Sequence, residues 1–199
     1  MSAQPGPLPP ASGERWRTEV TLEDLEDTAE LATGLAGLLG PGDLLVLTGG
    51  LGAGKTTFTQ SLGAALGVTG MISSPTFILS RIHRAQGTGP DLVHVDAYRS
   101  DSAGLESLDL LSTMAEAVTV VEWGRGVVES ALVGTDGSWL DLELLREDSS
   151  PSTDAAASDT SSKAEIITDF SETEAEVLGS ARRAVLRGYG PAWAQPPAL

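Results

Sequence analysis

The stretch Gly49–Thr57, GGLGAGKTT, follows an apolar run and precedes a helical pattern. Its spacing, Gly49-x-x-x-x-Gly54-Lys55-Thr56, is that of a phosphate-binding P-loop. Glycine lets backbone N–H groups converge on a polyanion, and the helix that follows adds its free N–H groups and the positive end of its dipole. The lysine suits the β and γ phosphates, and the threonine hydroxyl suits Mg²⁺. The residues expected to hold the phosphates are Gly50, Leu51, Gly52, Ala53, Gly54, Lys55, Thr56 and Thr57.

A magnesium ion beside a P-loop needs a carboxylate from a neighbouring strand, held directly or through water. Two acids end apolar runs: Asp96 ends LVHVD and Glu122 ends VTVVE. Ligands of open α/β sheets bind at the carboxyl ends of the strands, so we expect both acids at that edge. Thr56 and the two acids form the predicted metal site, and Lys55 with the same acids forms the predicted catalytic set. Which acid binds the ion, and which positions the attacking water, stays open.

Residues beside these acids have two interpretations each. His94 shares a strand face with Asp96, and it is either a structural hydrogen-bonding group or a catalytic one. Arg99, which follows Tyr98, either reaches a phosphate or forms an ordinary salt bridge. Trp123 either lines the nucleotide or a partner groove, or it packs in the core.

The composition excludes several classes of protein. The 199 residues include 28 acidic and 12 basic side chains, for a net charge of -16, so the surface as a whole repels nucleic acid and anionic lipid. There is no cysteine, which excludes disulfides and thiolate metal sites. No apolar run reaches membrane-spanning length and the first residues do not resemble a signal peptide, so we expect a cytoplasmic protein. Asparagine is absent, which argues against the guanine-reading motif of a conventional GTPase.

Strands and helices are expected to alternate along the chain. Thr21 with Asp24 resembles a capping box that opens a helix reaching Leu39, and Gly67 should end a helix over 55–66. The pattern of residues 139–145 alternates, which predicts a strand with one exposed face. The expected strands are 16–21 at an edge, 44–47, part of 91–99, 117–124 and 139–145. The predicted fold is α/β, a P-loop NTPase-like three-layer sandwich with a largely parallel central sheet.

Composition also divides the chain. Residues 1–15 are predicted to be a disordered tail, 16–146 the P-loop domain, and 147–180 an acidic, low-complexity and partly disordered insertion. Residues 181–199 should return to the domain, as either a helix or a strand.

Four motifs, GGLGAGKTTF, SSPTF, HVDAYR and VVEWG, in this order and spacing, resemble the TsaE (YjeE) family of small bacterial P-loop ATPases over about residues 21–145. The resemblance implies a role in making N6-threonylcarbamoyladenosine at position 37 of tRNAs that read codons beginning with A. It implies cofactors ATP and Mg²⁺ and a slow ATPase that resets a complex of the TsaB and TsaD proteins without transferring the threonylcarbamoyl group. Contact with tRNA would be indirect, and no membrane is implied.

The resemblance also assigns residues. Lys55, Thr56 and Thr57 match the phosphate and Mg²⁺ residues, Glu122 the Mg²⁺-associated acid and Asp96 the other essential carboxylate. A switch-like loop near the γ-phosphate corresponds to Ser74, Pro75, Thr76 and Phe77. Near the nucleoside, the candidates are Thr28 and either Arg182 or Arg183. Gly50 stands where the family usually has Asp, which should not abolish binding by backbone donors.

Two other functions remain open at this point. One is a small-molecule kinase, which shares the glycine loop and a strand-end acid followed by arginine; its lid arginines would have to come from Arg81 and Arg84. The other is a nucleotide-sensing module that binds ATP without turnover, against which the two strand-end acids argue.

Overall fold

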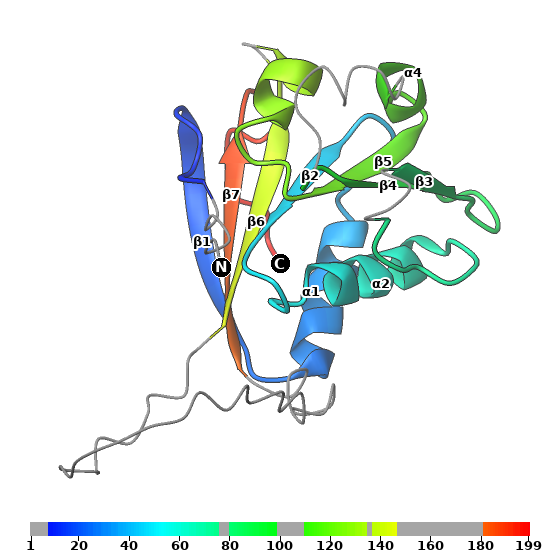
Figure 1. The fold of residues 1–199 in the computed structure, drawn as a ribbon, viewed down its shortest axis with the longest axis horizontal. Coiled ribbons are helices and arrows are strands. Elements are labelled where there is room, and N and C mark those ends of the chain that lie inside the picture. The colour runs from blue at the N-terminus through cyan, green and yellow to red at the C-terminus, as the bar shows by residue number, and fades with distance from the viewer. Residues whose placement is uncertain (1–7, 76–79, 99–109, 135–136, 147–180) are drawn as a thin grey trace, which may run out of the picture.

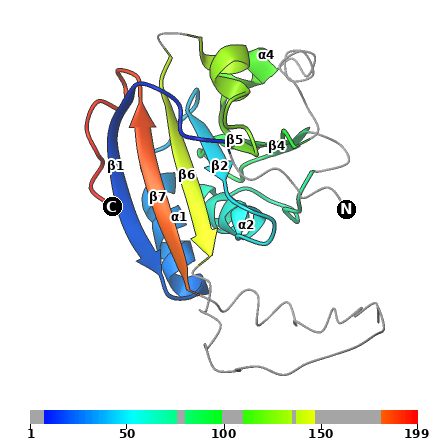
Figure 2. The same cartoon turned by 60° about the vertical axis from the view of Figure 1, so that its left-hand side comes forward.

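A single mixed sheet forms the centre of the chain in the computed structural model, which describes residues 8–75, 80–98, 110–134, 137–146 and 181–199. The strands in these ranges are β1 (Glu14–Leu22), β2 (Leu44–Thr48), β3 (Ser80–His83), β4 (Asp91–Asp96), β5 (Ala117–Glu122), β6 (Trp139–Arg146) and β7 (Arg182–Tyr189). Their order across the sheet is β1-β7-β6-β2-β5-β4-β3 (Figures 1 and 2). The four central strands β6, β2, β5 and β4 are parallel, and the outer strands pair antiparallel.

Helices cover both faces of this sheet. On one face, α1 (Leu25–Ala36) and α2 (Lys55–Leu66) bury Leu35, Phe58 and Leu62 against the strands (Figure 2). On the other face, α4 (Leu110–Met114) and the short helix η1 (Glu129–Val133) contribute to a second apolar cluster. The predicted α/β class and the largely parallel centre of the sheet are confirmed.

The segment that carries the glycine loop folds as its sequence predicts. All five residues of β2 are buried, as expected for a central parallel strand. Helix α2 has the predicted bounds and ends at Gly67, whose φ of 75° is left-handed. The buried strand and the helix therefore hold the loop between them at both ends.

The predicted start of the first helix is wrong. Thr21 lies in β1, paired with Arg183 of β7, and the N-cap is Asp24. The carboxylate of Asp24 accepts from the backbone N–H groups of Glu26 and Asp27. Strand pairing outweighs the local capping signal of Thr21, because Asp24 supplies an equally good cap three residues later.

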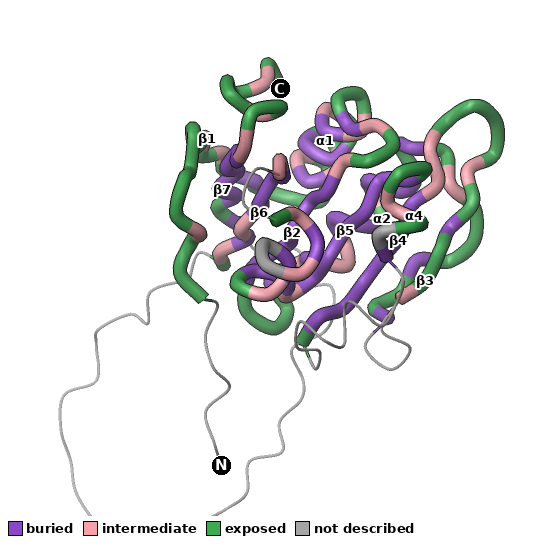
Figure 3. The backbone as a smooth tube through the Cα atoms, turned by 90° about the horizontal axis from the view of Figure 1, so that it is seen from above, coloured by how far each residue is buried: buried purple, intermediate pink, exposed green. Residues whose placement is uncertain are grey.

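The predicted exposed face of β6 is also wrong. Residues 139–142 are all buried, because Leu140 and Leu142 belong to one apolar cluster and Trp139 to the cluster on the other face. Figure 3 shows that buried backbone runs through the central strands of the sheet. The charged residue Asp141 is only 2% exposed. Two arginines from elsewhere in the chain, Arg125 and Arg187, neutralise it there.

The C-terminal segment is a strand and not a helix. β7 lies between β1 and β6, so residues on both sides of 147–180 build the same sheet (Figure 2). The predicted insertion, 147–180, is outside the described residues. Glu14 and Arg15, assigned to the N-terminal tail by composition, belong to β1. No helix in the described ranges has the length and apolar character needed to cross a membrane.

Candidate functional site

The glycine loop connects the end of β2 to the start of α2 with a tight, glycine-dependent backbone. Gly49 has φ 146°, and a Cβ there would lie 2.5 Å from the carbonyl oxygen of Leu144. Gly54, with φ 101°, is the N-cap of α2 and has no side chain that could cap it. The first intrahelical bond runs from Phe58 N to Gly54 O at 2.8 Å. The amides of residues 55–57 therefore precede the first bonded donor, which leaves the helix N-terminus suited to an anion.

Lys55 lies folded across this loop. Its Nζ donates to the carbonyl oxygens of Gly49 and Gly50, both at 2.9 Å, and lies 3.7 Å from the ring centroid of Trp123. The residue is 5% exposed. Burial lowers the pKa of Lys55 to about 8, although the charges of Glu122 and Asp96 oppose that shift. The ammonium is thus still mainly charged at neutral pH, and it is held by weak carbonyl partners that phosphate oxygens can replace.

The two strand-end acids are neighbours. β4 and β5 are parallel and their register pairs Asp96 with Glu122, so both buried carboxylates lie at one edge of the sheet. Glu122 Oε1 accepts from the Thr56 hydroxyl at 2.9 Å, which joins β5 to the first turn of α2. It also accepts from His94 Nε2 at 2.8 Å. Of the two interpretations of His94, the geometry matches the structural one, because the buried ring orients Glu122.

Asp96 faces the loop that precedes β3. Its Oδ2 accepts from the Ser74 hydroxyl at 3.3 Å and its Oδ1 from the backbone N–H of Tyr98 at 2.9 Å. Ser74 and Pro75 are at the start of the predicted switch-like loop. Thr76, Phe77 and Arg99 lie outside the described residues. The second acid is therefore tied to a different segment from the first.

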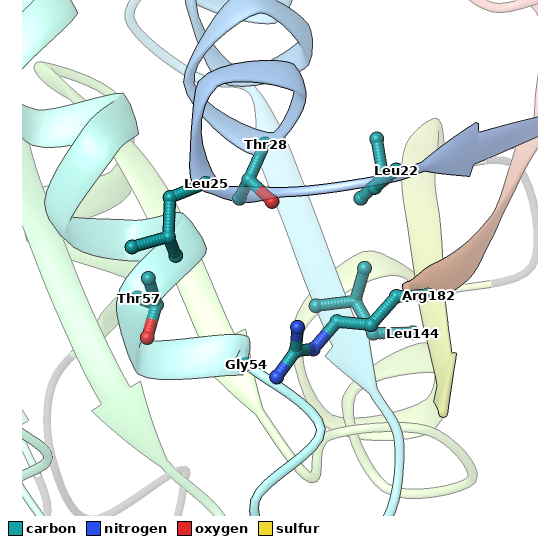
Figure 4. A pocket seen from close by; sticks show the side chains of 7 residues that line it. All are labelled: Leu22, Leu25, Thr28, Gly54, Thr57, Leu144 and Arg182. Carbon is teal, nitrogen blue, oxygen red and sulfur yellow. The ribbon is translucent and has the colours of Figure 1, made fainter. Parts of the chain in front are cut away.

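A small pocket lies beside the start of α2, between α1 and β7 (Figure 4). It is lined by Leu22, Leu25, Thr28, Gly54, Thr57, Leu144 and Arg182. Arg182 Nε donates to the carbonyl of Ala53 at 3.0 Å, and its side chain extends toward Gly54. Burial, and then the charge of Arg146, lower the pKa of Arg182. The pocket thus brings together Thr28 and Arg182, the two nucleoside-side candidates, from α1 and β7.

Arg183 points elsewhere. It forms a 3.5 Å pair with Glu19 on the surface, where its side chain is 50% exposed. Of the two arginines offered by the sequence, the fold brings Arg182 and not Arg183 to the glycine loop. Leu51, at the tip of the loop, is 76% exposed.

The oxygen ligands at the sheet edge fit a magnesium ion. Thr56 and Glu122 offer a hydroxyl and a carboxylate, and Mg²⁺ usually takes one or two protein carboxylates and completes its shell with phosphate and water. Within the described ranges, no three His, Cys, Asp or Glu side chains form a closed metal cage. Thr56 and Glu122 would supply two oxygen ligands to such an ion.

The turn after β5 is strained, a feature that the sequence pattern did not predict. Trp123 has φ 62°, a left-handed conformation that is rare for an aromatic residue. This conformation places its ring over Lys55 and 5.2 Å from the ring of Tyr98. Strain of this kind persists where the surroundings fix it, and it clusters at functional sites. The VVEWG motif drew attention to Trp123 as a candidate residue, but nothing in the sequence predicted its left-handed backbone conformation.

Comparisons with known proteins agree with these features. The family model described as "Threonylcarbamoyl adenosine biosynthesis protein TsaE" matches residues 22–153. Proteins called "tRNA threonylcarbamoyladenosine biosynthesis protein TsaE" are similar to the chain. That of Streptomyces coelicolor is 56% identical over 103 residues, covering 50% of this chain and 69% of the relative. That of Mycobacterium tuberculosis is 47% identical over 117 residues, covering 55% and 70%, and that of Bacillus subtilis 38% over 116 residues, covering 58% and 69%.

A solved structure supports the fold. The crystal structure of Bacillus subtilis YdiB superposes with a TM-score of 0.56, at 24% identity, over 88% of this chain and 87% of that one. At this identity the likeness concerns the arrangement of strands and helices.

Proposed function

The chain belongs to the TsaE family of threonylcarbamoyladenosine biosynthesis proteins, and from this membership and the geometry of the site we propose that it is an ATP-hydrolysing switch that acts on the TsaB–TsaD complex. The family takes part in making threonylcarbamoyladenosine in tRNA. The observation that carries the ATPase proposal is the meeting of Lys55, Thr56, Glu122 and Asp96 at one sheet edge, beside the N-terminus of α2. We also propose that the α/β fold of the chain is a P-loop NTPase-like three-layer sandwich.

Binding would begin with the phosphates. The amides of residues 55–57 and the α2 dipole attract the triphosphate, and Lys55 exchanges the carbonyls of Gly49 and Gly50 for β and γ oxygens. The amide donors belong to the first turn of α2, which packs on the sheet, so they need little reorganisation when the anion arrives.

The acids would divide two roles. Glu122, bonded to Thr56, would hold the metal, and the bond from His94 would keep its carboxylate oriented. Asp96, bonded to Ser74, is suited to position the attacking water near the segment that precedes β3. Thr56 and Glu122 would hold Mg²⁺, which would offset the negative charge of the β and γ phosphates.

The nucleoside would lie against the residues that line the pocket of Figure 4, next to Thr28 and Arg182. Arg182→Ala is expected to weaken ATP binding about 10-fold through loss of stacking and charge, and to affect inorganic triphosphate much less. Arg183→Ala is the matched control. It removes the same positive charge from the next residue in the sequence, whose side chain pairs with Glu19 on the surface. Calorimetric titration of both ligands checks this. Equal losses for the two ligands would assign Arg182 to the phosphates instead.

The switch proposal predicts slow turnover by the chain alone. With TsaB and TsaD present, we expect ATP hydrolysis to rise at least about 10-fold, because a partner completes the catalytic geometry. The test measures phosphate release by the chain alone, with the TsaB–TsaD complex, and with a panel of nucleosides and small alcohols. Phosphorylation of a small acceptor would replace the proposal with a kinase. Binding without turnover under every condition would leave a nucleotide sensor.

A further inference from the structure

A buried carboxylate on β6 joins two parts of the nucleotide site from the opposite face of the sheet. Thr48, the last residue of β2, donates from its hydroxyl to Asp141 Oδ1 at 2.8 Å. Thr48 and Asp141 are 3% and 2% exposed. The residue after Thr48 is Gly49, where the glycine loop begins. Asp141 therefore fixes the strand end from which the loop departs.

The same carboxylate fixes the turn after β5. Arg125 Nε donates to Asp141 Oδ1 at 3.4 Å, and its NH2 group donates to Oδ2. The other terminal nitrogen of Arg125 donates to the carbonyl of Leu8 at 3.0 Å, so the guanidinium is held on two sides. Arg125 follows Glu122 and Trp123 by three and two residues.

We propose that Asp141 is a positioning residue of the nucleotide site, whose carboxylate keeps the strand end at Thr48 and the turn at Trp123 in one fixed relation. The inference rests on the proposed ATP site, because its consequence is measured there. Asp141 contacts neither phosphate nor metal directly, since it lies on the face of the sheet opposite α1 and α2. It acts through Thr48 and Arg125.

The strained turn explains why such a link is needed. Trp123 places its ring over Lys55 in a left-handed backbone conformation that costs energy. Gly124 permits the turn, since a Cβ there would lie 2.8 Å from Val121. Arg125 then anchors it to β6. If that anchor is released, the turn can relax and the ring can leave Lys55.

Ion pairing for stability alone does not account for the arrangement. The free energy of taking charges out of water often exceeds the attraction between them, so apolar side chains would serve a purely structural position as well. Asp141 also accepts a hydrogen bond from Thr48, and the nearby acid Glu143 is bonded to arginines instead. Glu143 binds Arg187 at 2.8 Å and Arg125 at 3.3 Å, while the Thr48 hydroxyl donates to Asp141.

Glu143 is therefore the matched control. Burial raises its pKa, but the bonds and charges of Arg125 and Arg187 outweigh this and leave the pKa of Glu143 lowered. Glu143→Gln thus removes a paired, mostly buried carboxylate from the same cluster as Asp141→Asn does. Both variants should lower the melting temperature to a similar degree. They differ in whether the strand end before the loop loses its anchor.

The test compares the two variants by amide hydrogen exchange without ligand and by titration with Mg·ATP. In Asp141→Asn, we expect exchange to rise about 10-fold in residues 44–58 and 119–128, and ATP affinity to fall about 10-fold. Glu143→Gln should stay within about twofold of the wild type in both measurements. Thr48→Val, which removes only the hydroxyl donor, should raise exchange in 44–58 and decides the matter if Asp141→Asn does not fold.

Equal effects of Asp141→Asn and Glu143→Gln on exchange and affinity would overturn the proposal, because the cluster would then be merely stabilising. A different outcome would overturn this inference and leave the proposed function standing. In that outcome, Asp141→Asn binds ATP as tightly as the wild type, while Lys55→Ala loses affinity. Failure of the wild-type chain to bind ATP would overturn both.

Discussion

Replacing Lys55 by alanine is expected to lower ATP affinity by at least about 100-fold without unfolding the chain. The ammonium is almost fully buried and already bonded to two loop carbonyls, so it is held where β and γ phosphate oxygens would bind. Hydrogen bonds from a charged donor contribute about 1.5–3 kcal/mol each, and two of them account for the expected loss. Titration with Mg·ATP, followed by calorimetry, measures it.

The fold should tolerate this change. Burial of the Lys55 ammonium disfavours its charged form, as its pKa of about 8 indicates, so removing it relieves an unfavourable burial. Arg84→Ala is the control, because it removes one positive charge from a side chain that is 76% exposed and remote in sequence from the loop. That variant should bind ATP as the wild type does. If Lys55→Ala binds ATP with wild-type affinity, the proposal that the Lys55 ammonium binds the phosphates is wrong.

The strand, loop and helix around Lys55 were predictable because their signals are local. The apolar run of β2, the glycines at Gly49 and Gly54 and the stop at Gly67 each restrict the backbone within a few residues. The meeting of Asp96 and Glu122 was also predictable, since neighbouring parallel strands place their carboxyl ends at one edge. These local signals predicted where Lys55, Asp96 and Glu122 lie. The roles of these residues in binding and hydrolysis stay predictions.

The burial of Asp141 in β6 was not predictable from its own segment. Alternation of apolar and charged residues is typical of a half-exposed strand, and the pattern of residues 139–145 is just that. Asp141 is buried because Arg125 and Arg187 reach it from 16 and 46 residues away in the sequence. Only the order of strands in the sheet brings these arginines to β6. A one-dimensional pattern cannot distinguish water from a distant arginine as the partner of an acid.

The ends of the chain illustrate the same limit. The sequence of β7 fits a helix or a strand, and it becomes a strand because β1 and β6 offer pairing on both sides. The same pairing keeps Thr21 in β1 and leaves Asp24 to cap α1. Arg182 reaches the glycine loop for this reason alone, since its place on β7 sets its distance from Ala53.

Glu122→Gln is expected to reduce ATP hydrolysis by at least about 100-fold, both alone and with TsaB–TsaD. Glutamine keeps the size of the side chain and can still accept from Thr56, but it removes the negative charge that would face a bound Mg²⁺. ATP should therefore bind this variant in the absence of Mg²⁺, while the gain in affinity on adding Mg²⁺ is lost. Titrations with and without the ion, beside phosphate-release rates, separate the two effects.

Asp96→Asn separates the roles of the two acids. If Asp96 positions the attacking water through its place beside Ser74, this variant should lose hydrolysis and keep the Mg²⁺-dependent gain in affinity. Asp91→Asn, at the other end of β4 in a surface pair with Arg84, should change neither. Loss of the Mg²⁺ gain in Asp96→Asn and its retention in Glu122→Gln would exchange the two roles. Retention in both variants would move the metal away from this edge of the sheet, where Asp96 and Glu122 are paired neighbours.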